Sequence, residues 1–338
     1  MCACSAPRSP QVDAGAGEPR LRLVLTTSPR HVYKENDGRD GKGTTESAVF
    51  RIVVRGPTGP GSDPQGATVE LRSAGAVVKT IHYSAAALTA VHGFEDTPYS
   101  DDHDALYAVR LLMKEPVALA VDSAMVTLEA GGTSSSLVVP IGVYVQKTSL
   151  HFPIRGDFMI VTGHATAEGG HQERSQNFAF DAVGLGPHLE LLRGDGTKNT
   201  DFVGYGLDVL ATGDGVVVYA RNDVADNPAN GNQDFGALLL LPDPPWGIAG
   251  NCIVIDHQNG EFSLLAHMQP GSVRVKKGDY VRQGDVLGKL GNSGATTGPH
   301  LHYHLMDGPT LLRSDGLPAR FTNTCVPVPK PGQWCDAQ

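Results

Sequence analysis

Two histidines near the end of the chain stand one residue apart, in Pro299-His300-Leu301-His302-Tyr303. Side chains alternate between the two faces of a β-strand, so His300 and His302 would project from the same face. Two imidazoles on one face can bind a metal ion together, or one can bind it while the other activates its water. The pattern also occurs by chance on apolar strands, so its interpretation depends on the surrounding segments.

Two earlier segments carry side chains suited to the same chemistry. His171 and Asp181 are separated by nine residues, and His267 follows the apolar run Leu264-Leu265-Ala266. Two imidazoles and one carboxylate would leave an open tetrahedral position for water, which is the arrangement of catalytic rather than structural zinc. Such a site needs strands that hold these segments side by side.

Short strands are predicted along most of the chain, because alternating or apolar runs are separated by turn residues. The runs between residues 20 and 147 have the spacing of an immunoglobulin-like β-sandwich. Beyond Gln146-Lys147-Thr148 most of the remaining histidines occur, and Asn259-Gly260 predicts a hairpin. We therefore expect an all-β chain with a flexible N-terminal tether (1–19), a β-sandwich accessory domain (20–147), an antiparallel β-rich domain (148–326) and a C-terminal tail (327–338).

Charge and hydropathy exclude several classes of partner. The net charge is −9 and no basic stripe is present, so we expect no nucleic-acid partner. No apolar run is long enough to span a bilayer, and the first twenty residues lack the apolar core of a signal peptide. Cys4 is a weak indication of a lipidated N-terminus. The oligomeric state stays open.

The cysteines do not form a C-x-x-C zinc pair. Cys325 and Cys335 flank a proline-rich stretch and could close a small loop as a disulfide, which would fit an oxidising compartment. Cys252 opens an apolar strand and is expected to be a small core residue.

From about residue 160 to 306 the chain resembles the LytM/lysostaphin-type zinc endopeptidases, peptidase family M23. The similarity is strongest in AHMQPGSVRVKKGDYVRQGDVLGKLGNSGATTGPHLHYHL, which begins at Ala266. In that family a histidine strand leads to a Val-x-x-Gly-(Asp/Gln) hairpin, a glycine-rich turn and Gly-Pro-His-Leu-His. Upstream, YGLDVLATGDGVVVYA resembles the strand pair that runs into the family's D/N-G turn.

The resemblance implies a role for each histidine of the pattern. It makes His171, Asp181 and His302 the ligands of one Zn²⁺ ion, and His267 and His300 the catalytic histidines that do not bind metal. His300 would act as general base on the zinc-bound water, and His267 would polarise the water or stabilise the tetrahedral oxyanion. His304 shares a face with His302 and is expected to be a neighbour of the site, whereas His257, beside the hairpin turn, is expected to be exposed.

One spacing departs from the family, which commonly has three residues between the first ligand histidine and the aspartate. Nine residues separate His171 from Asp181 here. His164 is therefore a rival first ligand, and Glu173 is a further oxygen donor. We favour His171 because it is nearer and the polar loop can fold back. The loop at 222–245 is the expected rim of a substrate groove.

The function implied by the resemblance is zinc-dependent hydrolysis of stem or cross-bridge peptides in bacterial peptidoglycan, in the cell envelope or outside the cell. The alternative is a catalytically inactive LytM-like protein that binds wall or activates another hydrolase. A lipoyl-type carrier is a distant third, since Lys289 lies inside a strand-like run rather than at a hairpin tip. The N-terminal sandwich would bind wall or cover the groove.

Overall fold

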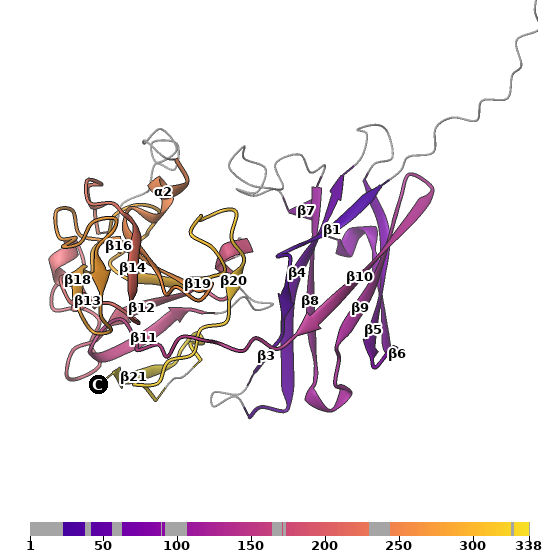
Figure 1. Ribbon diagram of the computed structural model, residues 1–338, viewed down its shortest axis with the longest axis horizontal. Coiled ribbons are helices and arrows are strands. Elements are labelled where there is room, and N and C mark those ends of the chain that lie inside the picture. The colour runs from indigo at the N-terminus through magenta and orange to yellow at the C-terminus, as the bar shows by residue number, and fades with distance from the viewer. Residues whose placement is uncertain are drawn as a thin grey trace, which may run out of the picture.

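The computed structural model describes residues 23–37, 42–55, 63–88, 90–91, 107–163, 171, 174–229, 244–325 and 328–337. These residues form an almost entirely β structure, in which two β-rich halves are joined by a linker around residues 143–149 (Figure 1). The α-helix among them is the short α2 (Pro244–Ala249), and no described helix has the length and apolar character needed to cross a membrane.

Two sheets make up the N-terminal half. The first has the order β1-β4-β8-β7 with β3 on β4, and the second has the order β2-β10-β9-β5-β6. The strands are β1 (Val24–Ser28), β2 (Val32–Tyr33), β3 (Glu35–Asn36), β4 (Thr45–Arg55), β5 (Pro64–Ser73), β6 (Ala76–Ser84), β7 (Ala90–Val91), β8 (Tyr107–Pro116), β9 (Ser123–Ala130) and β10 (Thr133–Gly142), with 3-10 turns η1 (Ala85–Ala87) and η3 (Val117–Leu119).

A shared apolar core joins these two sheets. Phe50 and Ile52 of β4 pack in the same cluster as Leu71 of β5 and Val126 and Leu128 of β9. Alternate residues of β9 are buried, as expected for a strand with one face on a core. The half is therefore a two-sheet β-sandwich, the class that the strand spacing predicts.

A nine-stranded sheet dominates the C-terminal half, in the order β17-β14-β15-β16-β19-β12-β11-β21 with β20 on β19. A separate ladder pairs β13 with β18. The strands are β11 (Gly156–Thr162), β12 (Phe180–Gly184), β13 (Asp208–Leu210), β14 (Gly215–Ala220), β15 (Asn251–Asp256), β16 (Phe262–Met268), β17 (Tyr280–Val281), β18 (Val286–Lys289), β19 (Leu301–Met306), β20 (Gly316–Leu317) and β21 (Trp334–Ala337), with 3-10 turns η4 (Arg174–Gln176) and η5 (Asn199–Asp201).

Aromatic rings fill the core on one face of this sheet. Phe152 stacks on Phe158 with ring centroids 3.9 Å apart, and Phe180, Tyr303 and Phe321 pack around them. Because side chains alternate along a strand, burial of Phe180 and Tyr303 on this face turns their neighbours to the other face. The apolar packing thus sets which way the polar residues of β12 and β19 project.

The segment expected to be a C-terminal tail contributes to this sheet. Residues 334–337 form β21, which pairs with β11 in antiparallel register. Cys335 and Ala337 face the core, and a disulfide joins Cys335 to Cys325. Cys252 is buried and free, as the sequence predicts. Residues 1–19 lie outside the described residues.

The linker between the halves is held by a buried carboxylate. Glu261 follows the Asn259-Gly260 turn and accepts hydrogen bonds from the Tyr144 hydroxyl at 2.5 Å and from the backbone amides of Lys147 and Thr148 at 2.7 Å each.

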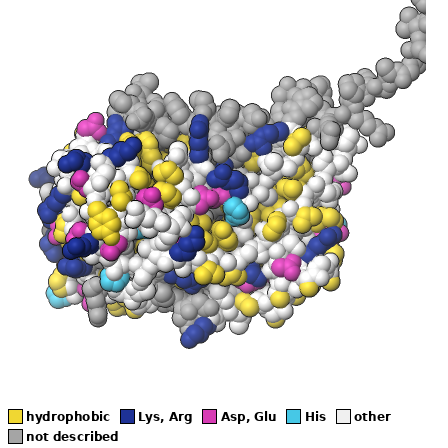
Figure 2. All heavy atoms as spheres, in the orientation of Figure 1, with side chains coloured by type: hydrophobic (Ala, Val, Ile, Leu, Met, Phe, Trp, Pro, Cys, Tyr) yellow, Lys and Arg dark blue, Asp and Glu magenta, His cyan; other side chains and the backbone are white. Residues whose placement is uncertain are grey.

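Figure 2 shows one face of both halves, where lysine and arginine side chains are interspersed with acidic and apolar ones.

Candidate metal centre

Strand register brings the first two predicted ligands together. Asp181 of β12 lies directly opposite His302 of β19, and directly opposed residues of neighbouring strands have Cβ atoms about 4.5–5.5 Å apart. Both side chains leave the face opposite the aromatic core. His302 Nδ1 lies 2.9 Å from Asp181 Oδ1. This pair follows from the ladder and needs no loop to form.

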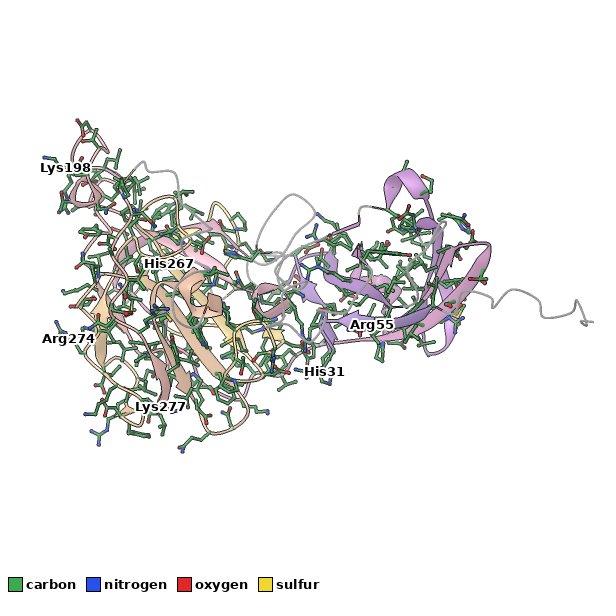
Figure 3. The ribbon with its side chains drawn as sticks, turned by 90° about the horizontal axis from the view of Figure 1, so that it is seen from above. His31, Arg55, Lys198, His267, Arg274 and Lys277 are labelled. Atoms are coloured by element: carbon green, nitrogen blue, oxygen red, sulfur yellow. A yellow bond between two sulfur atoms is a disulfide. The ribbon has the colours of Figure 1, made fainter. Side chains whose placement is uncertain are left out.

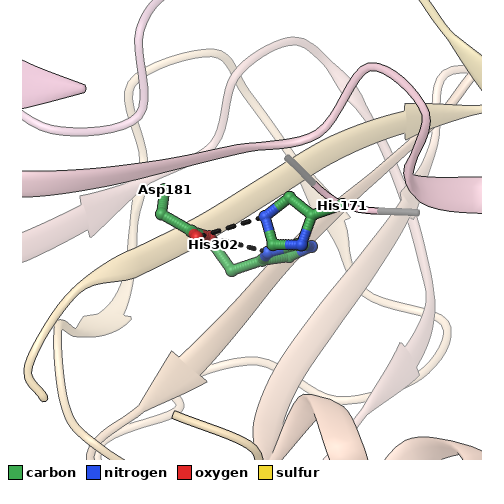
Figure 4. Close-up of side chains that lie close together, drawn as sticks. All are labelled: His171, Asp181 and His302. Atoms are coloured by element: carbon green, nitrogen blue, oxygen red, sulfur yellow. Dashed lines mark hydrogen bonds and ion pairs between the residues drawn. The ribbon is translucent and has the colours of Figure 1, made fainter. Parts of the chain in front are cut away.

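His171 reaches the same point from outside the sheet. Its Nε2 lies 3.1 Å from Asp181 Oδ2, and its ring meets the ring of His302 edge-on with centroids 4.6 Å apart. One ligand atom from each of His171, Asp181 and His302 lies within 4.8 Å of the others (Figure 4). The structure thus brings the three predicted ligands together, whereas His164 and Glu173 lie outside the described residues.

The chemistry of these three side chains fits a zinc ion. His171 Nε2 is buried and makes no hydrogen bond, although it lies next to a carboxylate oxygen. A buried imidazole nitrogen that makes no hydrogen bond beside a carboxylate is expected where it serves as a metal ligand. Two imidazole nitrogens and a carboxylate oxygen are the donor set of many catalytic zinc sites, with one position left for water.

The protonation states also suit ligands. Burial lowers the pKa of His302 to about 4, which keeps its imidazole neutral. Burial by itself would raise the pKa of Asp181, but the neighbouring His300 and His171 overcome it and hold that pKa well below its usual range. Neutral imidazole and ionised carboxylate are the forms that bind metal.

His304 fixes which nitrogen of His302 faces the cluster. His302 Nε2 lies 2.9 Å from Nδ1 of His304, a fully buried residue on the same face of β19. The Nδ1 atom of His302 is therefore the one directed at Asp181. The remaining nitrogen of His304, Nε2, makes no hydrogen bond.

The two histidines predicted to be catalytic lie beside this cluster. Their ring centroids are 4.8 Å apart, and the ring of His267 lies 5.7 Å from that of His302. Figure 3 shows His267 inside the C-terminal half. His300 Nε2 lies 3.4 Å from Asp181 Oδ1. The structure thus gathers all five side chains singled out in the sequence.

Backbone carbonyls orient both rings. His267 donates from Nδ1 to Ser293 O at 2.8 Å, and His300 donates from Nδ1 to Gly298 O at 2.8 Å. His300 Nδ1 also lies 2.9 Å from the hydroxyl of Thr296. In the neutral rings each Nε2 then carries a lone pair. His267 adopts a left-handed backbone conformation, with φ of 64°, a strained geometry that often occurs at functional sites.

The two rings differ in their affinity for protons. Burial, together with the nearby His300 and His302, holds the pKa of His267 well below its usual range. Burial also opposes protonation of His300, but the Asp181 carboxylate outweighs it and raises the pKa of His300. His267 is therefore the neutral partner of the pair and His300 the more basic one.

A cleft of about 380 Å³ opens beside Asp181 and His300. Its lining combines apolar side chains with the Asp181 carboxylate, the His300 imidazole and two threonines. The other lining residues are Val161, Thr162, Val183, Leu191, Phe202, Ala229, Thr297, Gly298 and Pro299. Of the predicted rim at 222–245, residues 230–243 lie outside the described residues.

The expectation that His257 is exposed is wrong. Its side chain is buried, with Nε2 2.7 Å from the hydroxyl of Ser263 and Nδ1 donating to Asp214 O at 2.8 Å. The backbone at Gly213 covers the ring, because a Cβ at that position would lie 3.1 Å from it. A turn signal predicts a bend in the chain but not what packs over it.

Comparison with known proteins gives one family. The model of peptidase family M23 matches residues 196–313, a range that contains His267, His300 and His302 and begins after His171 and Asp181. The chain is 37% identical over 110 residues to the peptidoglycan DD-endopeptidase ShyA of Vibrio cholerae serotype O1, which covers 32% of this chain and 20% of that protein.

Other relatives show the same partial coverage. The chain is 36% identical over 81 residues to the DD-carboxypeptidase/endopeptidase Mpg of Neisseria meningitidis serogroup B, covering 24% of this chain and 16% of that one. The match thus spans about a fifth of these relatives' length. A solved structure of the catalytic domain of the M23 protein EnpA from Enterococcus faecalis aligns with a TM-score of 0.32 and 18% identity, over 50% of this chain and 93% of that one.

Proposed function

Because residues 196–313 belong to peptidase family M23, a family of metallopeptidases, we propose that this protein is a zinc-dependent endopeptidase that hydrolyses peptide bonds in bacterial peptidoglycan. The observation that carries the proposal is the convergence of His171, Asp181 and His302 on one point beside two further histidines. Bound zinc lowers the pKa of a coordinated water from 15.7 to about 7 and polarises a carbonyl oxygen.

His300 is the general base in this proposal. Its Nδ1 proton is engaged by Gly298 O, so the lone pair of Nε2 points towards Asp181 and the metal ligands. The raised pKa of His300, set by Asp181 against the effect of burial, favours proton uptake. A base that takes a proton from water and then returns it to the leaving amine contributes about 10²–10⁴-fold to the rate.

His267 has a different task because it stays neutral. With Nδ1 bound to Ser293 O, its Nε2 can accept a hydrogen bond from the attacking water but has no proton for an oxyanion. Its lowered pKa, caused mainly by burial, favours this state. We therefore assign His267 to orientation of the water and His300 to proton transfer.

Peptidoglycan is proposed as the substrate because the relatives are named as peptidoglycan DD-endopeptidases. The cleft beside His300 offers both apolar side chains and polar groups, as a peptide with apolar side chains and a polar backbone requires. A wall substrate places the protein in the cell envelope or outside the cell.

Digestion of purified peptidoglycan with the zinc-loaded full chain, followed by mass spectrometry of the fragments, tests the proposal. We expect peptide cleavage that a chelator abolishes and one zinc per chain. The His302→Ala variant should lose zinc and activity together. His300→Ala should keep zinc and lose about 10²–10⁴-fold in rate, and His188→Ala, in an exposed loop, should match the wild type.

Each outcome decides one part of the proposal. Equal loss of zinc in His302→Ala and His300→Ala would contradict the division of roles. Absence of metal-dependent cleavage across walls with different cross-bridges would overturn the enzyme and favour a wall-binding relative.

A further inference from the structure

A buried arginine anchors the segment that carries His171. Arg174, three residues after His171, begins η4 and is 3% exposed. Its Nε donates to Oδ1 of Asp315, which is fully buried, and its Nη2 donates to Arg313 O at 3.2 Å. Removing one partner of a buried ion pair leaves an uncompensated charge in the interior, which is strongly unfavourable. The pair therefore holds η4 firmly against the loop before β20.

Backbone packing fixes the same segment from the other side. A Cβ added to Gly316 of β20 would lie 2.7 Å from Ser175 O and 3.0 Å from the carbonyl carbon of Ser175. Only glycine allows η4 and β20 to approach this closely. His171 thus lies just before η4, and the side chain of Arg174 and the backbone of Ser175 in η4 both contact residues 313–316.

The second oxygen of Asp315 binds the N-terminal sandwich. Asp315 Oδ2 accepts hydrogen bonds from the backbone amides of Arg30 at 2.9 Å and His31 at 3.3 Å. Arg30 also donates from Nη2 to Arg313 O at 3.0 Å, so this carbonyl is shared between Arg30 and Arg174. Figure 3 shows His31 at the junction of the two halves.

We propose that Asp315 is a positioning residue that couples the N-terminal sandwich to His171, so that contacts made by the Arg30-His31 turn strengthen metal binding. The proposal rests on the proposed function, in which His171 binds zinc. Charge-assisted hydrogen bonds from both halves hold one carboxylate, and that carboxylate holds Arg174. Residues that orient a ligand from behind typically change metal affinity 10–100-fold when altered.

A second metal site at this junction is the competing interpretation, because His31, Asp307 and Asp315 lie close enough to share an ion. The charges oppose it. Both oxygens of Asp315 already accept hydrogen bonds, and Asp307 Oδ1 accepts one from the Asp315 amide at 2.7 Å. The guanidinium groups of Arg30 and Arg174 supply the positive charge.

Zinc affinity of the full chain, measured by competition with a chelating dye, tests the coupling. We expect Asp315→Asn to bind zinc about 10–100-fold more weakly, and excess zinc to restore its activity because the ligands remain. Glu35→Gln is the matched control. Glu35 also joins the halves, but its carboxylate binds Arg320, at 2.9 Å, where Asp315 binds Arg174 of η4. Its zinc affinity should change less than about twofold.

Two further variants separate the parts of the proposal. Arg30→Pro removes both the amide that donates to Asp315 Oδ2 and the guanidinium, and it should weaken zinc binding by a smaller factor than Asp315→Asn. If Arg30→Pro matches the control while Asp315→Asn is impaired, coupling to the sandwich is refuted. If the thermal transition shows that Asp315→Asn fails to fold, Arg174→Lys replaces it. Lysine keeps the positive charge but loses the second donor to Arg313 O. Wild-type zinc affinity in Arg174→Lys would also refute the proposal.

His171→Ala distinguishes this inference from the proposed function. If His171→Ala binds zinc like the wild type, the ligand assignment fails and the inference fails with it. If His171→Ala loses zinc but Asp315→Asn binds it normally, the inference alone is overturned.

Discussion

The contact between His302 and His304 leads to a prediction in which stability and metal affinity separate. His304 is fully buried, and burial holds its pKa well below the usual range, so its ring is neutral. In the metal-free chain the Nδ1 proton of His302 is donated to Asp181 Oδ1, so His302 Nε2 accepts from His304 Nδ1 at 2.9 Å; with a metal ion on Nδ1, the proton of His302 would move to Nε2 and be donated to His304. In the metal-free chain the lone pair of His304 Nε2 has no partner. The perturbation is His304→Leu.

Two effects on the metal-free protein oppose each other. Leucine leaves the buried Nε2 of His302 without a hydrogen-bond donor, which costs about 1–3 kcal/mol. It also removes the unpartnered Nε2 of His304, which relieves a similar cost of about 1–3 kcal/mol. We therefore expect the free energy of unfolding of the metal-free chain to change by less than about 1.5 kcal/mol, as in other size-conserving core substitutions.

Zinc affinity has no such compensation. The hydrogen bond to His304 sets the tautomer and ring angle of His302, and loss of such support costs about 10–100-fold in affinity. At 1.36 kcal/mol per tenfold, this is about 1.4–2.7 kcal/mol of binding free energy. The effect should therefore be visible in metal binding and nearly absent from apo stability.

Urea unfolding of the metal-free chain and dye-competition titration with zinc measure the two quantities. His304→Asn is the control, because its side-chain oxygen can accept from His302 in place of Nδ1 and should recover much of the affinity. Wild-type affinity in His304→Leu, or equal loss in the asparagine and leucine variants, would refute the reasoning.

Three further predictions concern the frame around the site. Burial lowers the pKa of His257, so below pH 6.5 the unfolded chain takes up a proton that the folded chain does not, and the free energy of unfolding should fall as the pH drops. Urea titrations between pH 7.5 and 5 should show a shallower fall for His257→Gln than for the wild type. Parallel curves for the two proteins would contradict this role. Glu261→Gln should lower the free energy of unfolding by about 2–4 kcal/mol, because a buried acceptor of three hydrogen bonds becomes an amide that also presents donors. An unchanged urea midpoint would argue against this role of Glu261. Gly294 has φ of 82°, and a Cβ at this position would lie 2.5 Å from Gly250 N. Gly294→Ala should therefore displace the neighbouring Ser293 carbonyl, which orients His267, and lower the cleavage rate more than the zinc affinity. Equal losses in rate and affinity would count against this reasoning.

Local sequence patterns determined the chemistry of individual strands. In Phe180-Asp181-Ala182 and in Leu301-His302-Tyr303 an apolar residue stands on each side of a polar one, and both strands project the polar side chain away from the aromatic core. The period of two is a property of the extended backbone, so it can be read without knowledge of the partner strand. The all-β class follows from the same alternation.

Positions that depend on distant segments were not accessible in this way. The sequence favoured His171 over His164 only by proximity, whereas the structure places His171 Nε2 3.1 Å from Asp181. The burial of His257 depends on the loop at Gly213, and the pairing of β21 with β11 depends on where the chain returns after the 171 residues between Thr162 and Trp334. Each is decided by packing between segments far apart in the chain.

By itself, therefore, the sequence determined which side chains could bind a metal and which face of each strand they occupy, because those properties are local. The tertiary structure alone decided how the ligands are supported. Arg174 contacts Asp315 across 141 positions, and Asp315 contacts Arg30 across 285. No local period encodes such contacts, since the first forms when distant segments of the C-terminal half pack together and the second when the two halves pack against each other.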